Sequence, residues 1–251
     1  IFAAAKLDLL HVPHFNVPLT YRGKLVVTIH DLLWHEQRGA AVTTLKPWLY
    51  WFKYLFYHLI VLRAVSAAQV IFVPAVTIKE TVSKYYPSVS SKIIVTYEGV
   101  EQTFKKNRPP HLPVNKQRGD GDIELVYTGS LYPHKNIEVV LQMLQQYPGV
   151  HLTIMGSRSV FRNAVEARCR ELAVQYQVTF AGQVSDQELR ELYNKADALV
   201  QPSLSEGFGL TGLEALAVGI SCPAVGKRVR RRQFDLFLTY CRADVTGDIQ
   251  I

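Results

Sequence analysis

VTFAGQVSDQELRELYNKADALVQPSLSEGFGLTGLEALAV, residues 178–218, is the stretch of the chain that decides its fold. Two short apolar segments in it are typical of buried strands, and a segment of helical period follows each of them. The strands are expected at Val178–Phe180 and Ala198–Gln201, and the helices at 186–195 and 211–218. Buried strands that alternate with helices indicate an α/β layer with a parallel sheet.

The alternation extends toward the N-terminus. Further strands are predicted at Leu7–Val12, Lys24–Ile29, Gln69–Val73, Lys92–Tyr97, Ile123–Thr128 and His151–Met155. Further helices are predicted at 44–66, 76–86, 137–147 and 160–176. Residues 105–121 are rich in proline and charge, which predicts a linker between an N-terminal domain (1–104) and a C-terminal domain (122–225). The predicted fold class is α/β, with two Rossmann-like, doubly wound domains and a cleft between them.

The composition sets limits on the class of protein. A chain of 251 residues, 48% hydrophobic and 20% charged, suits two packed domains rather than a disordered or fibrous protein. Of the net charge of +7, six basic and three acidic residues place +3 in segment 226–251 and leave +4 for the rest, which argues against nucleic acid as a partner. Three cysteines without a CxxC pair favour a cytoplasmic protein, and no apolar run is long enough to cross a membrane.

The turn EGFGL, residues 206–210, follows a predicted strand and leads into a predicted helix, where open α/β sheets bind ligands. Gly207 and Gly209 let the backbone approach a ligand, and the start of the helix attracts an anion such as phosphate. Glu206 and Glu214, eight residues apart, are able to accept hydrogen bonds from hydroxyl groups. The turn therefore predicts a site for a sugar attached to a phosphate.

Two capping-box patterns occur in this region. Thr211 and Glu214 fit one of them, which leaves open an alternative in which Glu214 only bonds back to the helix cap. Ser185 and Glu188 fit the other, at the start of the helix predicted at 186–195, where no functional role is needed.

A second candidate segment is YTGSLYPHKN, residues 127–136. A strand ends at Thr128, Gly129 turns the chain, and Lys135 stands directly before the helix predicted at 137–147. A lysine at a helix start is unfavourable against the helix dipole, which favours a phosphate contact over a solvated charge. The neighbouring His134 is interpreted as structural or solvent-facing.

A third candidate segment lies in the N-terminal domain, where a predicted strand in VVTIHDLLWHE ends at His30 and Asp31. His30 is expected to reach toward a ligand, although a hydrogen-bonded loop histidine is the default reading of such a residue. His35 and Glu36 have no metal-ligand spacing, and no HExxH, P-loop or GxSxG motif occurs in the sequence. No metal site is therefore predicted.

KPWLYWFKYLFYHLIVLR, residues 46–63, mixes basic residues with Trp, Tyr and Phe. This mixture is typical of a helix that lies on a membrane surface, so a peripheral contact with the inner face of a membrane is left open as an alternative. The favoured reading is a helix mostly buried against the N-terminal sheet.

Several segments resemble, in order, the landmarks of one family: LVVTIHDL, YEGVEQTF, YTGSLYPHKNIEVVL and FAGQVSDQELRELYNKADALVQPSLSEGFG. SEGFGLTGLEALAVG resembles the E-x7-E motif of the retaining, GT-B-fold glycosyltransferases of family 4, the glycosyl transferases group 1. The resemblance covers about residues 7–225. It implies a C-terminal domain that binds a nucleotide sugar and an N-terminal domain that binds the acceptor.

The resemblance also implies roles for individual residues. Glu206 would bind hydroxyls of the donor sugar, Glu214 the ribose and Lys135 the diphosphate. The implied catalytic residues are Glu206, His30 and Lys135, and the implied substrate-binding residues are Glu214, Gly207, Phe208, Gly209, Leu210, Gly129 and Ser130. Ser130 stands where the family often has arginine, which puts one diphosphate contact in doubt.

The reaction implied is transfer of a hexose to a glycan or glycolipid acceptor with retention of configuration, without a cofactor or divalent metal. GDP-mannose is the favoured donor, and a UDP-sugar stays open. The family's first strand is expected before Ile1, and the tail 226–251 departs from the pattern and is expected to be disordered. Both domains are then expected to be incomplete, which leaves a catalytically inactive nucleotide-sugar-binding fragment as the alternative.

Overall fold

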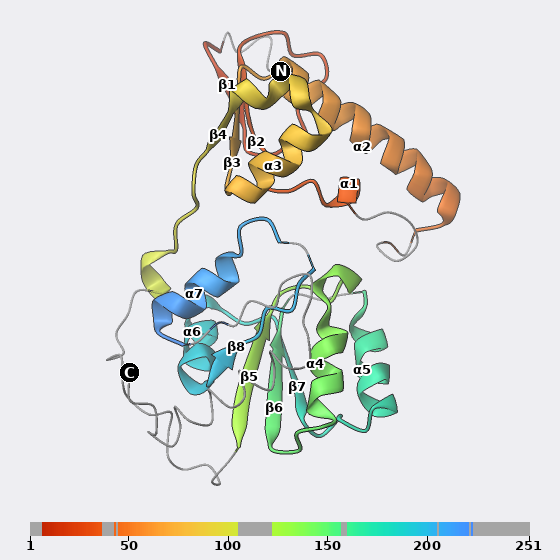
Figure 1. The fold of residues 1–251 in the computed structure, drawn as a ribbon, viewed down its shortest axis with the longest axis vertical. Coiled ribbons are helices and arrows are strands. Elements are labelled where there is room, and N and C mark those ends of the chain that lie inside the picture. The colour runs from red at the N-terminus through yellow and green to blue at the C-terminus, as the bar shows by residue number, and fades with distance from the viewer. Residues whose placement is uncertain are drawn as a thin grey trace. The chain divides into compact units, whose positions relative to one another are not determined.

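The computed structural model describes residues 7–36, 43, 45–104, 122–156, 160–204, 206–220 and 222. They form two compact units, the first built mainly from residues up to Glu98 and the second mainly from residues after it (Figure 1). The predicted linker, 105–121, and the predicted disordered tail, 226–251, lie outside the described residues. The N-terminal domain was predicted to run through residue 104. The structure instead has a short 3₁₀ turn, η3 (Gln102–Phe104), in the second unit, and Phe104 is buried in a core of that unit.

The first unit is built on a sheet of four parallel strands in the order β1-β2-β3-β4. These are β1 (Leu10–Val12), β2 (Leu25–Thr28), β3 (Val70–Val73) and β4 (Ile93–Val95). Its helical elements are α1 (Leu33–Glu36), α2 (Pro47–Ala67), α3 (Val76–Tyr85) and the 3₁₀ helix η2 (Pro87–Lys92). Each predicted strand is present, and the observed strands are shorter than predicted.

The core of the first unit lies between this sheet and its helices. Val27, Ile71 and Ile93 stand side by side on three neighbouring strands, and all three are buried. Val61 and Val65 of α2 pack into the same cluster. Helix α2 therefore buries one face against the unit's core, but the reading of a mostly buried helix is wrong, because its other face carries exposed apolar side chains such as Trp48 and Leu55.

The second unit contains a sheet of four parallel strands in the order β7-β6-β5-β8. These are β5 (Ile123–Thr128), β6 (Val150–Met155), β7 (Val178–Gly182) and β8 (Ala198–Leu199). Its helical elements include η4 (Pro133–Lys135), α4 (Ile137–Leu144), α5 (Arg162–Glu171), α6 (Asp186–Lys195) and α7 (Leu210–Val218). The predicted strand 123–128 and the predicted helix 186–195 are reproduced residue for residue.

Successive residues of β5 enter different cores because side chains alternate between the two faces of a strand. Leu125 lies in a cluster with Val140 of α4 and Val165 of α5. Val126 lies in another cluster, with residues of α6 and α7. Figure 1 shows these two pairs of helices on opposite sides of the sheet. The sheet is therefore covered on both faces, which confirms the predicted α/β fold with parallel sheets.

Helix α6 begins with the predicted capping box. The Ser185 hydroxyl accepts a hydrogen bond from the Glu188 amide at 3.3 Å, and the Glu188 carboxylate accepts one from the Ser185 amide at 2.7 Å. The Ser185 amide and hydroxyl hold the pKa of the Glu188 carboxyl below its usual range. This pair is fully explained by helix capping.

Candidate functional site

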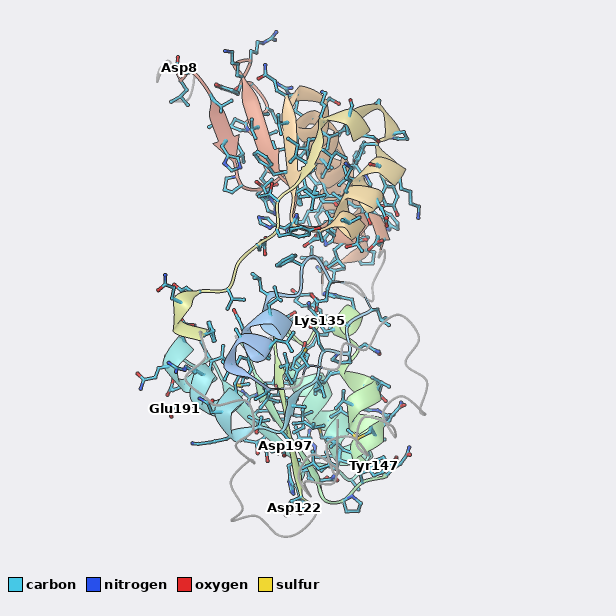
Figure 2. All side chains as sticks on the ribbon, turned by 60° about the vertical axis from the view of Figure 1, so that its left-hand side comes forward. Asp8, Asp122, Lys135, Tyr147, Glu191 and Asp197 are labelled. Atoms are coloured by element: carbon cyan, nitrogen blue, oxygen red, sulfur yellow. The ribbon has the colours of Figure 1, made fainter. Side chains whose placement is uncertain are left out.

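The carboxyl ends of β5 and β8 bring two of the predicted segments together. The two strands are parallel neighbours, with Leu125 opposite Ala198 and Val126 opposite Leu199. The loops that follow them, residues 129–136 and 200–209, therefore leave the same edge of the sheet. Figure 2 shows Lys135 at this end of the second unit and Asp122 and Asp197 toward the other.

Gly129 turns the chain directly after β5. Its φ of 145° lies in a region that side chains rarely adopt, and its amide donates to the Met155 carbonyl at 3.0 Å. The Tyr127 hydroxyl donates to the Ser130 carbonyl at 2.5 Å and fixes the next residue. Gly156 lies against this turn, because a Cβ atom there would collide with the Gly129 carbonyl oxygen. Gly156 was not predicted, although a glycine directly after a strand is the signal that marks it.

Lys135 is half-buried and lies at the last position of η4. Asn136, in the left-handed conformation with φ 56° and ψ 34°, joins η4 to α4. Lys135 thus stands just before the start of α4, at the carboxyl edge of the sheet, where the sequence predicted it. An amino group and the positive end of a helix dipole there both favour a bound anion.

The loop that holds Lys135 is tied to the segment after β8 by two hydrogen bonds. The Asn136 side-chain amide donates to the Pro202 carbonyl at 3.1 Å. The Leu204 amide donates to the His134 carbonyl at 2.8 Å. His134 is buried, in agreement with its structural interpretation. The segment that leads into the EGFGL turn is therefore fixed against the Lys135 loop.

Helix α7 begins at Leu210, and its N-cap is Gly209 with φ 84° and ψ 43°. No side chain of the described residues caps it. Thr211 already lies inside the helix, within 3.4 Å of the Gln201 side-chain amide, so the capping-box reading of Thr211 and Glu214 is wrong. The glycine at the cap position replaces the hydroxyl cap that this reading required.

Gln201 was not predicted to contribute to the site. A Cβ atom at Gly212 would approach its Oε1 to 2.8 Å, so any side chain there would push the Gln201 amide aside. The Gln201 side chain thus lies against the first turn of α7, where it also donates to the Thr211 hydroxyl at 3.4 Å. The glycine in the first turn of a helix was the available signal for this approach.

Glu214 lies one turn into α7 and is half-buried. Burial and the nearby carboxyl groups of Asp186 and Glu101 raise the pKa of the Glu214 carboxyl. Among the residues that the structure describes, none donates a hydrogen bond to this carboxylate. A half-buried acceptor without a donor is an arrangement that a ligand with hydroxyl groups would complete.

The remaining residues of the predicted turn lie between β8 and α7. Glu206, Gly207 and Phe208 are half-buried, and Leu210 is 38% exposed. Glu206 is placed in the irregular segment before the helix, as predicted, and outside any cap. The turn thus offers backbone groups and one carboxylate next to the first turn of α7.

His30 belongs to the first unit, so it is described within that unit. Strand β2 ends at Thr28, which puts His30 in the following loop rather than in the strand. Its Nδ1 lies 2.8 Å from Glu98 Oε1, and its Nε2 lies 3.2 Å from the Pro13 carbonyl oxygen. The side chain is 46% exposed, so this imidazole is held on both nitrogens and still reaches the surface.

His35 has a structural role that was not predicted. It is buried, with its Nδ1 2.7 Å from the Tyr57 hydroxyl and its Nε2 2.8 Å from the Tyr86 hydroxyl. Burial, with a smaller contribution from Tyr54, raises the pKa of Tyr86 to about 12. Within the described ranges no three metal-ligating side chains lie close enough to hold a metal ion.

Comparison with known proteins relates the chain to one family of enzymes and to one fold. Residues 112–226, which contain Lys135, Glu206 and Glu214, match the family Glycosyl transferases group 1. This match places residues 112–226 in the group 1 glycosyltransferases. The chain is 27% identical over 199 residues to the O-antigen chain mannosyltransferase RfbU of Salmonella typhimurium, covering 77% of this chain and 54% of that protein. The chain thus spans about half the length of this curated relative.

Solved structures support the fold of the chain. Sucrose-phosphate synthase from Thermosynechococcus elongatus matches with a TM-score of 0.67 at 20% identity, covering 88% of this chain and 57% of that chain. HepE from Anabaena, in complex with UDP-glucose, also matches with a TM-score of 0.67, at 16% identity, covering 98% of this chain and 71% of that chain. The predicted GT-B fold is therefore confirmed.

Proposed function

We propose that the protein transfers a hexose from a nucleotide sugar to a glycan or glycolipid acceptor with retention of configuration. The observation that carries the proposal is Glu214, a half-buried carboxylate without a hydrogen-bond donor among the described residues, one turn into α7. The loop before this helix is hydrogen-bonded to the loop that holds Lys135. An acceptor for hydroxyls and a cation for phosphate, fixed at one sheet edge, suit a nucleotide sugar.

In this proposal Lys135 and the starts of α4 and α7 bind the diphosphate. They would stabilise the negative charge that develops when the bond between sugar and diphosphate breaks. Glu214 would accept hydrogen bonds from the ribose, and Glu206 from the donor sugar. The backbone from Gly207 to Leu210 and the turn at Gly129 and Ser130 would line the phosphates.

The amino group and the two helix starts bring positive charge to the diphosphate, so the proposed mechanism needs no divalent metal. His30 would lie near the transferred sugar, held in its orientation by Glu98 and the Pro13 carbonyl. The sugar would keep its anomeric configuration.

The donor favoured by this proposal is GDP-mannose. The relative RfbU, to which 77% of this chain aligns, is a mannosyltransferase by name. A UDP-hexose is the second candidate, because HepE, with a similar fold, was solved in complex with UDP-glucose. We place the reaction in the cytoplasm, at the inner face of a membrane.

Two measurements on the same protein test the proposal. Calorimetric titration with GDP and UDP tests binding, and incubation with GDP-mannose or UDP-glucose and a glycolipid acceptor tests transfer, with the anomeric configuration of the product read by NMR. Binding together with transfer that retains the configuration is the expected result. Binding without transfer would instead support the catalytically inactive nucleotide-sugar-binding protein, and no binding of either nucleotide would overturn both.

A further inference from the structure

Helix α2 exposes a continuous apolar face. Tyr57, Val61 and Ala64 of this helix are buried in the core of the first unit, whereas the opposite face carries large apolar side chains in solvent. These exposed side chains, named here the α2 face, are Trp48, Trp51, Phe52, Leu55, Phe56, Leu59 and Leu62. Their spacing of three and four residues places them on one stripe along the helix.

The α2 face is larger than an incidental surface patch. Each of its side chains is about half exposed, which leaves roughly 100 Å² per residue for side chains of this size. Seven of them give about 700 Å², whereas the largest apolar patch on a typical soluble monomer is about 300 to 600 Å². An area of this size on one stripe indicates a surface that binds something.

The charge of the sequence in and beside α2 indicates what this surface binds. From residue 37 to residue 79 the sequence has no acidic residue and five basic ones, Arg38, Lys46, Lys53, Arg63 and Lys79. This segment alone accounts for +5 of the net charge of +7. Lys46 and Lys53 are exposed on or just before α2, so the apolar stripe is accompanied by positive charge.

We propose that the α2 face is a lipid-binding surface that lies flat in the interface of a bilayer containing anionic lipids. Exposed Trp and Phe beside Leu, with Lys53 in the helix, Lys46 just before it and no acid along it, have the composition of interfacial helices. The basic side chains match the negative charge of phosphate headgroups. No described helix is long and apolar enough to cross a membrane. The proposal does not depend on the glycosyl transfer proposed above.

Vesicle flotation tests the proposal on the whole chain, because bound protein rises with the vesicles while aggregated protein sinks. The protein is expected to float with phosphatidylcholine vesicles that contain phosphatidylglycerol and to float at least about tenfold less with phosphatidylcholine alone. Quenching of tryptophan fluorescence by brominated lipid is expected for Trp48 and Trp51, without any substitution. A protein that stays at the bottom with anionic vesicles, or shows no quenching, overturns the proposal.

A matched pair of variants locates the surface. Leu55 and Leu59 are 57% and 50% exposed on α2, and Leu19 and Ile94 are 57% and 50% exposed elsewhere in the first unit. The double variant Leu55→Gln/Leu59→Gln is expected to lower vesicle binding about tenfold or more, and Leu19→Gln/Ile94→Gln is expected to leave it within about twofold.

Two results of these experiments would overturn the proposal. Equal losses in the two double variants would mean that binding is unspecific adhesion of apolar side chains. A dimer in analytical ultracentrifugation that Leu55→Gln/Leu59→Gln dissociates, with no vesicle binding by the unsubstituted protein, would assign the α2 face to a second copy of the chain.

Discussion

The side-chain amide of Asn136 donates a hydrogen bond of 3.1 Å to the carbonyl oxygen of Pro202. The two residues are far apart in the sequence, and the bond joins the loop after β5 to the loop after β8. Lys135 precedes Asn136 directly, and the EGFGL turn follows Pro202 closely. Together with the bond from the Leu204 amide to the His134 carbonyl, this side chain holds the proposed phosphate-binding segment against the chain that leads into the sugar-binding turn.

Replacing Asn136 tests this link. Asn136→Ala loses the bond to Pro202 and forces alanine into a left-handed conformation, so the free energy of unfolding is expected to fall by about 2 kcal/mol. Asn136→Gly loses only the bond and is expected to cost about 1 kcal/mol. Urea denaturation of the two variants measures both effects. If both variants were as stable as the unsubstituted protein, the bond would not fix the loops.

Lys135→Ala is expected to weaken binding of GDP or UDP by about 1.5 to 3 kcal/mol, the range for a charge-assisted hydrogen bond. Calorimetric titration measures the dissociation constants. Lys195→Ala is the control, because Lys195 ends α6 at the opposite edge of the same sheet. Equal affinity of Lys135→Ala and the unsubstituted protein would remove Lys135 from the proposed site.

Glu206→Gln tests whether Glu206 contacts the donor sugar rather than the nucleotide. The substitution keeps the shape of the side chain and removes its charge, so nucleotide affinity is expected to stay nearly unchanged while donor turnover falls about 100-fold or more. Titration with the nucleotide and a turnover assay with the nucleotide sugar give the two values. A parallel collapse of both would show that Glu206 supports the structure of the turn instead.

Glu214→Gln is expected to stabilise the protein at neutral pH. Burial and nearby carboxyl groups raise the pKa of the Glu214 carboxyl, so the charged form is less favourable in the native protein than in the unfolded chain. The stability from this group is fully present below the unfolded pKa of about 4.3 and is lost as pH rises through the folded pKa.

Urea denaturation at pH 4 and pH 7 checks this expectation. The variant should gain stability over the unsubstituted protein between the two pH values, and its nucleotide affinity should fall. Glu188, which the Ser185 amide and hydroxyl stabilise in its charged form, should show the opposite pH dependence when replaced by glutamine. Its replacement should leave nucleotide affinity unchanged.

The strand and helix pattern could be predicted because local signals decide it. Strand Ile123–Thr128 and helix Asp186–Lys195 match their predictions. The apolar run marks the extent of the strand, and the capping box marks the start of the helix. The strand predicted at 92–97 begins one residue later and ends two residues earlier, because η2 runs through Lys92 and the pairing with β3 stops at Val95. Which strands pair depends on the tertiary structure, so the sequence of one segment does not determine where its pairing ends.

The predicted site residues fall where the parallel strands end, and this much follows from the order of strands and helices. The contacts between different segments could not be predicted from this order. Gln201 against Gly212, Gly156 against Gly129 and Glu98 against His30 all depend on which strands are neighbours. The capping-box alternative for Glu214 was wrong although Thr211–Glu214 shares its pattern with Ser185–Glu188. The cap residue of α6 is Ser185 in an extended conformation, whereas the cap residue of α7 is Gly209 in the left-handed conformation.

The glycine cap of α7 leaves the start of this helix without the side-chain partner that Ser185 gives α6. A bound phosphate would take the place of that missing cap, so the nucleotide would become part of the helix's own hydrogen-bonding. Binding of the nucleotide and folding of the protein are then thermodynamically linked. At a hundredfold excess over its dissociation constant a ligand adds about 2.7 kcal/mol to stability. Thermal unfolding with and without nucleotide would therefore report donor choice even before any acceptor is known.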